Sequence, residues 1–138
     1  MTKKESLEMS IEMWSWLRDR AIDGKYYDKK AWFEETRNRY VSCGCYLCEY
    51  AEEASGGGFS CVQCPIEQWR KEAGADKFFH PLSYFPCTDV HSPYFTWKRG
   101  IENKDSGRVL EGTIKMVELL ENELKSLKEL EDRSEKDD

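Results

Sequence analysis

The chain has 138 residues, the size of one domain, and its five Trp, seven Tyr and six Phe exclude a globally disordered protein. The net charge is −6, with ten acidic and five basic residues in 111–138 and seventeen acidic and sixteen basic residues in 1–110. A nearly neutral body with an acidic C-terminus does not favour non-specific electrostatic binding of nucleic acid.

Two helices are predicted in the first 41 residues. Between residues 5 and 23, apolar side chains recur at three- and four-residue spacing, which is typical of an amphipathic helix, and Gly24 is a suitable stop. Residues 28–41 predict a second helix that Asp28 can cap. The apolar stripe of the first helix comprises Leu7, Ile11, Trp14, Leu17 and Ala21, and the second helix carries Trp32, Phe33, Thr36 and Tyr40.

The middle of the chain, residues 42–93, contains all six cysteines and all four prolines but little regular apolar periodicity. Short helices are expected over 49–54 and over 65–73, where proline opens the second segment and glycine follows it. A region of short helices and loops can hardly offset the entropy of ordering its own backbone. We therefore expect an additional stabilising element here.

The last third of the chain predicts a helix over 94–104 and a long helix over about 106–133, followed by a disordered tail over 134–138. Apolar residues of the long helix recur three and four apart, as in a short coiled coil. These residues are Leu110, Val117, Leu120, Leu124 and Leu127. Two interpretations remain open: the stripe packs on the first helix, or it pairs with a second copy to form a homodimer.

Four cysteines form two C-x-x-C pairs with twelve residues between them. Each C-x-x-C turn places two sulfurs on the same side of a tight knuckle, and two knuckles close a tetrahedral four-thiolate zinc site. The predicted zinc ligands are Cys45, Cys48, Cys61 and Cys64. Cys87 could replace one of these four ligands; if it does not, we expect it to be a buried free thiol near the site. We expect Cys43 to be a partly exposed free thiol. Zinc binding worth about 10–16 kcal/mol would stabilise the middle region.

The cellular compartment supports metal binding over disulfides. Acidic residues interrupt the first twelve positions before the apolar core of a signal peptide forms, and no apolar run approaches the ~18–20 residues of a membrane span. We therefore expect a cytoplasmic protein that does not enter a membrane. Thiols stay reduced in that compartment, where paired cysteines more often bind metal.

The sequence lacks the motifs of common catalytic sites. It contains no G-x-x-x-x-G-K-S/T, no G-x-G-x-x-G and no H-E-x-x-H. His80 and His91 do not have the spacing of a catalytic triad or of a metal-ligand pair. A closed four-sulfur shell also leaves no open position on the metal for a substrate. We expect a protein that is not an enzyme.

Aromatic and basic residues lie near each other in several places along the chain. A pocket built from them could stack a base and bind phosphates, and the candidate binding residues are Trp69, Arg70, Tyr94 and Trp97. Lys98 and Arg99 lie close to the last two in the sequence. The simpler interpretation is that the rings belong to the core and the charges are solvated.

Five sequence segments resemble a group of small proteins encoded by bacteriophages of Gram-positive hosts. The group's pattern is M-W-x-W-[IL], C-x-L-C-E-Y-A, C-x-x-C-P-[IL]-x-x-W, a later Cys, and Y-x-x-W. These segments correspond here to residues 13–17, 45–51, 61–69, Cys87 and 94–97. The resemblance covers about residues 9–100, and Cys43 is not part of the pattern. The resemblance implies a phage accessory protein in the bacterial cytoplasm. It does not imply any particular biochemical activity.

The sequence therefore predicts a mainly α-helical single domain, residues 1–138, organised around a structural zinc site with four cysteine ligands. Its parts would be N-terminal helices over 5–41, a zinc-binding region over 42–93, C-terminal helices over 94–133 and the tail. The expected function is that of a non-catalytic phage accessory protein that binds a host protein, such as a bacterial defence factor, and inhibits or redirects it. The alternative is a nucleic-acid or nucleotide-binding zinc protein.

Overall fold

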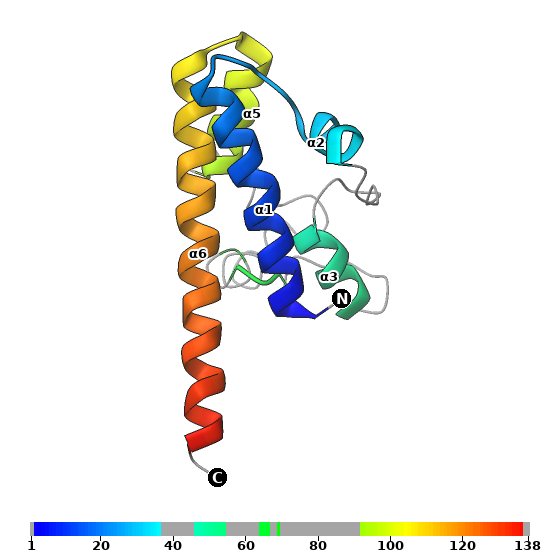
Figure 1. The fold of residues 1–138 in the computed structure, drawn as a ribbon, viewed down its shortest axis with the longest axis vertical. Helices are drawn as coiled ribbons and strands as arrows, with labels where there is room; N and C mark the ends of the chain where they lie inside the picture. The colour runs from blue at the N-terminus through cyan, green and yellow to red at the C-terminus, as the bar shows by residue number, and fades with distance from the viewer. Residues whose placement is uncertain (1, 37–45, 55–63, 67–68, 70–91, 137–138) are drawn as a thin grey trace, which may run out of the picture.

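The computed structural model describes residues 2–36, 46–54, 64–66, 69 and 92–136. These residues form helices, and no strand occurs among them, so the predicted mainly α-helical fold with a long C-terminal helix is confirmed for the part that is described. The helices are α1 (Lys3–Ile22), α2 (Lys29–Thr36), α3 (Tyr46–Ala54), α5 (Pro93–Asn103) and α6 (Ser106–Lys136) (Figure 1).

Helix α1 begins with a capping box. The Thr2 hydroxyl accepts a hydrogen bond from the Glu5 amide (3.0 Å), and the Thr2 amide donates to Glu5 Oε1 (3.2 Å), so that two amide donors near the start of the helix are satisfied. At the other end, Gly24 has a φ of 77° and Lys25 N donates to Arg20 O (2.9 Å). The glycine thus follows the end of the helix, as the sequence predicts.

Helices α1, α5 and α6 form the main bundle. Helix α6 makes its most extensive contacts with α5 and then with α1, and it runs antiparallel to both (Figure 1). The turn between α5 and α6 is short: Lys104 has a left-handed φ of 53°, and Asp105 Oδ1 accepts from Arg108 N (3.3 Å) at the start of α6. A short turn of this kind holds α5 and α6 as a helical hairpin.

Aromatic rings fill the centre of the bundle. Trp14 of α1 is 2 % exposed, and its ring meets Trp97 of α5 edge to face with the centroids 4.9 Å apart. The Tyr94 ring lies 6.0 Å from Trp14, again edge to face. The buried residues that α6 adds to this core are Val109, Met116, Val117 and Leu120. Burial of such large side chains is the main source of stability.

Helices α2 and α3 lie to one side of the bundle, and α3 packs on α1 (Figure 1). Asp28 caps α2 as predicted, because its Oδ1 accepts from Ala31 N (3.1 Å). Trp32 and Phe33 are buried, and their rings lie 5.9 and 5.8 Å from that of Tyr46 on α3. The predicted continuation of α2 to residue 41 and the predicted helix over 65–73 lie largely outside the described residues.

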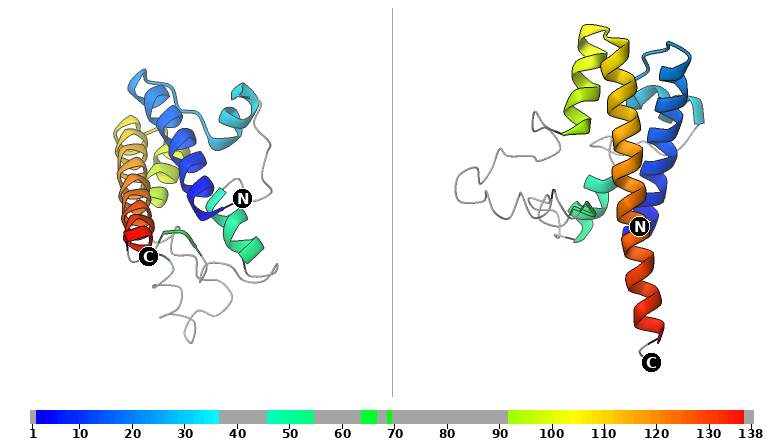
Figure 2. Two further views of the ribbon diagram at one scale, coloured as in Figure 1. Left: turned by 60° about the horizontal axis from the view of Figure 1, so that its bottom comes forward. Right: turned by 90° about the vertical axis from the view of Figure 1, so that its left-hand side faces the viewer.

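The C-terminal part of α6 extends past the N-terminus of α1 and past the other described helices (Figures 1 and 2). Within residues 106–133, whose burial the structure describes, Leu120 is the last buried residue, and none of the side chains in 121–133 is buried. The helix continues to Lys136, which includes the first residues of the expected disordered tail. We refer to residues 121–136 as the α6 overhang.

Candidate functional site

The structure describes two of the five predicted zinc ligands. Cys48 lies in α3 and is half-buried, and Cys64 is 8 % exposed and directly precedes the buried residues Pro65 and Ile66. Cys45, Cys61 and Cys87 lie outside the described residues. Among the residues that are described, no three His, Cys, Asp or Glu side chains form a group able to hold a metal. The four-thiolate site therefore remains a prediction.

The surroundings of the Cys64 sulfur fit a structural metal. Cys64 belongs to the hydrophobic core, together with Leu47, which precedes Cys48 on α3. Thiolates are the preferred ligands of structural zinc, and an apolar shell limits the access of water to such a site. The ligand chemistry of Cys48 and Cys64 is thus suited to zinc.

The structure describes three of the four predicted binding residues, and they lie in different environments. Trp69 and Trp97 are 7 % and 3 % exposed and belong to the hydrophobic core. Tyr94 is half-buried, lies 5.8 Å from Trp97 between ring centroids and borders a hollow on the surface. Arg70 lies outside the described residues. Of the three that are described, Tyr94 is therefore the one that lies at a surface where a ligand can reach it.

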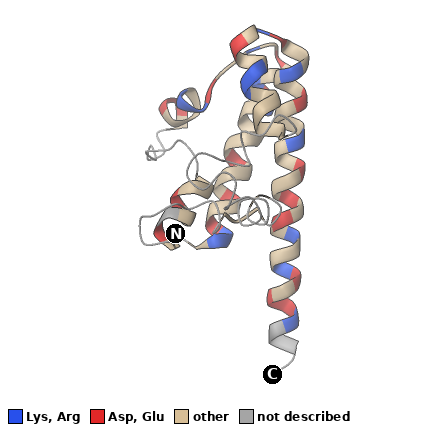
Figure 3. Ribbon diagram, turned by 180° about the vertical axis from the view of Figure 1, so that it is seen from behind, with Lys and Arg blue, Asp and Glu red and all other residues tan. Residues whose placement is uncertain are grey.

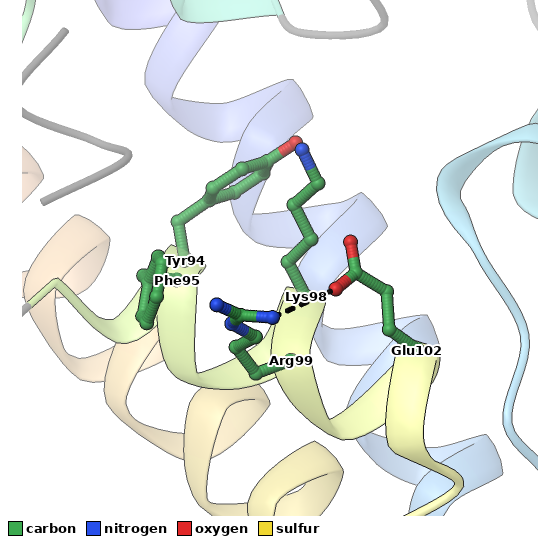
Figure 4. A pocket seen from close by; sticks show the side chains of 5 residues that line it. All are labelled: Tyr94, Phe95, Lys98, Arg99 and Glu102. Atoms are coloured by element: carbon green, nitrogen blue, oxygen red, sulfur yellow. Dashed lines mark ion pairs between the residues drawn. The ribbon is translucent and has the colours of Figure 1, made fainter. Parts of the chain in front are cut away.

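The hollow beside Tyr94 has a volume of about 200 Å³ and lies along one face of α5 (Figure 4). Its other lining side chains come from positions one, four, five and eight residues after Tyr94, which share one side of a helix. The full lining is Tyr94, Phe95, Lys98, Arg99 and Glu102. We call this feature the α5 hollow.

Positive charges surround the α5 hollow and are held against its aromatic rings. The Lys29 ammonium group donates to the Tyr94 hydroxyl (3.1 Å) and lies 4.7 Å from the centre of the Tyr94 ring. The Arg99 guanidinium lies 5.3 Å from the centre of the Phe95 ring, and its Nη1 is 3.6 Å from Glu102 Oε2 (Figure 4). Sequence reasoning missed Lys29, because only the fold brings it to α5. Phe95 and Glu102 follow from helical spacing around Tyr94.

The α6 overhang is the second candidate surface. Leu124 and Leu127 are half-buried against the core, whereas Leu130 is 59 % exposed. The overhang contains six acidic and four basic residues, and both charges recur along the part of it that Figure 3 colours by residue type. The N-terminal part of the predicted coiled-coil stripe, including Val117 and Leu120, is buried within the chain.

In comparisons with known proteins, no family model matches the sequence, and no similar chain was found among curated proteins or solved structures. None of the described helices combines the length and apolar character needed to cross a membrane.

Proposed function

We propose that this chain is a non-catalytic accessory protein that binds another protein through the α6 overhang. The observation that carries the proposal is the course of α6, which continues to Lys136 although none of the side chains in 121–133 is buried. At 1.5 Å per residue, the overhang is about 24 Å long. Leu124 and Leu127 near its start still pack partly against the core, and the helix beyond Leu127 is presented away from the bundle (Figure 1).

A helical extension of this kind gains stability from a partner. Helices without tertiary packing are marginal in water, because most helical stability in proteins comes from burial of an apolar face. Leu130 is exposed, and it lies three residues after Leu127 on the same side of the helix. An amphipathic helix that lays such residues into an apolar groove is a recurrent mode of protein recognition.

The charge of the overhang indicates the kind of groove. With six acidic and four basic residues, residues 121–136 carry a net charge of −2. Complementary charge at the rim of an interface steers association and selects among partners. The expected partner therefore has an apolar groove with a basic rim.

The zinc site has a structural role in this proposal. Cys45, Cys48, Cys61 and Cys64, with Cys87 as the alternative, would hold the metal and fix residues 42–93 on the bundle. Bound zinc would supply folding free energy to a region with little apolar periodicity. The burial of Cys64 in the core supports a metal that joins this region to the helices.

The resemblance to phage-encoded proteins indicates where to look for the partner. It supports a host protein in the bacterial cytoplasm, for example a defence factor, that this chain would inhibit or redirect on binding. A second copy of the chain is the competing occupant of the overhang, because the coiled-coil stripe continues into it through Leu124 and Leu127.

The test compares two matched variants in a pull-down from bacterial lysate. Leu130 and Ile22 are both exposed aliphatic residues (59 % and 63 %), and Ile22 ends α1 at the opposite end of the molecule (Figure 1). We expect Leu130→Glu to lose a stoichiometric partner that the wild type and Ile22→Glu retain. Retention of the same proteins by all three chains would contradict the proposal, as would size-exclusion evidence that the overhang binds a second copy.

A further inference from the structure

Independently of the protein-binding function, we propose that the α5 hollow binds a small phosphate monoester. The ligand would contact Lys98, Arg99 and the Tyr94 hydroxyl, with Lys29 adding positive charge from the first position of α2. Three properties of the described residues support this site. Aromatic rings hold two of the cations in place, the ion pair that an anion would have to break is weak, and the charge of the hollow is positive.

Aromatic rings position two of the cations before any ligand arrives. The ammonium group of Lys29 lies over the Tyr94 ring, and the guanidinium of Arg99 lies over the Phe95 ring, at 4.7 and 5.3 Å from the ring centres. A cation over an aromatic face is attracted by the ring's quadrupole. Donors that are already oriented lose less conformational entropy when an anion binds.

The protein contacts that compete with an anion are weak. Arg99 pairs with Glu102 at 3.6 Å, and the two side chains are 53 % and 48 % exposed. A solvent-exposed ion pair of this kind contributes little to stability, whereas a phosphate can accept two parallel hydrogen bonds from a guanidinium. Lys98 is exposed and forms no ion pair with any residue whose position is described.

The size and charge of the α5 hollow favour a monoester over other phosphates. Two cations and one carboxylate line it, and its net positive charge attracts the nearly dianionic phosphate monoester more strongly at pH 7 than a singly charged phosphate diester. Its volume of about 200 Å³ lies below the ~300–1,000 Å³ of pockets for drug-sized ligands. The hollow therefore suits a phosphate group and the atoms next to it.

The aromatic rings do not form a platform for a nucleic-acid strand. Binding of single strands depends on bases that stack on exposed aromatic faces. Here Lys29 covers one face of Tyr94 and Arg99 one face of Phe95, while the neighbouring Trp97 is buried. We therefore assign recognition to the phosphate, with little contribution from a base.

Isothermal titration of the full chain with inorganic phosphate, AMP and 3′,5′-cyclic AMP tests this assignment. Cyclic AMP carries the same base as AMP, but its phosphate is a singly charged diester. We expect phosphate and AMP to bind with similar affinity and cyclic AMP about tenfold more weakly. Affinity for AMP should fall between pH 7 and pH 5, because the second phosphate pKa is about 6.

Two lysine variants supply the matched control. Lys98→Ala should weaken AMP binding about tenfold, whereas Lys30→Ala, which removes the same charge from an exposed position on α2, should leave it unchanged. An equal loss of AMP affinity in both variants would show that AMP is attracted only by the general positive charge of this surface, and it would overturn the proposal. Absence of heat with phosphate and AMP at millimolar concentration, or equal affinity for AMP and cyclic AMP, would also overturn it.

Discussion

Gly112 of α6 lies directly against Trp97 of α5. A Cβ atom built at position 112 would come within 2.5 Å of Trp97 Cβ and 2.6 Å of its amide nitrogen. Only a hydrogen atom fits in that space, so the glycine allows the two helix backbones to approach closely. The contact lies at the residue whose ring packs against Trp14 in the core, on the same helix as the α5 hollow.

We predict that Gly112→Ala strongly destabilises the fold. The added methyl group meets backbone atoms of α5, which cannot rotate away as a flexible side chain could. Overpacking of this kind costs about 3 kcal/mol, equivalent to a fall of about 10 °C in Tm. Thermal unfolding followed by circular dichroism measures the change. A variant as stable as the wild type would show that α5 and α6 are not packed this closely.

Gly107→Ala is the control on the same helix. The nearest atom to a Cβ at position 107 is Asp105 Oδ1, at 3.5 Å, which is an ordinary van der Waals contact. Alanine is the better helix former by up to about 1 kcal/mol. The Tm should therefore stay the same or rise slightly, and a large fall would contradict the assigned turn between α5 and α6.

The predicted zinc site is tested by single cysteine substitutions. Cys48→Ser should release the metal, which a colorimetric chelator assay detects, and should unfold residues 42–93. Cys43→Ser should retain one zinc per chain, because Cys43 is not a predicted ligand. If Cys48→Ser keeps its zinc and its melting curve, the four-thiolate assignment is wrong.

Much of the bundle could be predicted from apolar spacing alone. The stripe expected on the first helix has Leu7, Trp14, Leu17 and Ala21 buried in the structure, with Ile11 half-buried. The bounds of α1, α5 and α6 differ from the predicted ones by a few residues. Local signals sufficed here because caps, glycine stops and helical periodicity all agree.

Other features depend on contacts that spacing does not show. Tyr94 and Trp97 are three residues apart on one helix, yet one borders the α5 hollow and the other lies in the core. The requirement for glycine at position 112 depends on Trp97, which belongs to a different helix. The stripe on α6 also does not indicate that burial ends at Leu120, because this depends on where α1 begins beside it.

Glu5 provides a pH-dependent test of the α1 cap. The hydrogen bond from the Thr2 backbone amide and, to a smaller extent, the Thr2 side chain lower the pKa of the Glu5 carboxyl below the ordinary value of 4.5. A lowered folded-state pKa means that the cap stabilises α1 above pH 4.5 and loses this effect as the pH falls through the folded-state value.

An NMR titration of the Glu5 carboxyl measures this effect directly. Its pKa should lie below 4.5 in the wild type and return towards 4.5 in Thr2→Pro, which removes the backbone donor at a φ of −81° that proline can adopt. Thr2→Val, which removes only the hydroxyl, should give an intermediate value. Identical titration curves in all three chains would contradict the capping box.

Truncation separates the overhang from the bundle. A chain that ends at Leu127 keeps the half-buried Leu124 and Leu127 but lacks the exposed end of α6. Its free energy of unfolding should change by less than about 1 kcal/mol, because few folded-state contacts are removed. A loss as large as that of Gly112→Ala would mean that the end of α6 stabilises the bundle rather than serving a partner.

Site-specific photo-crosslinking in bacteria that express the chain shows whether the α6 overhang binds a different protein. A benzophenone amino acid is placed at position 130 on the overhang or at position 22 on the opposite end, and the crosslinked products are identified by mass spectrometry. We expect a discrete heterologous protein crosslinked from position 130 and not from position 22. No product from position 130, or a product that contains only a second copy of the chain, would contradict the proposal.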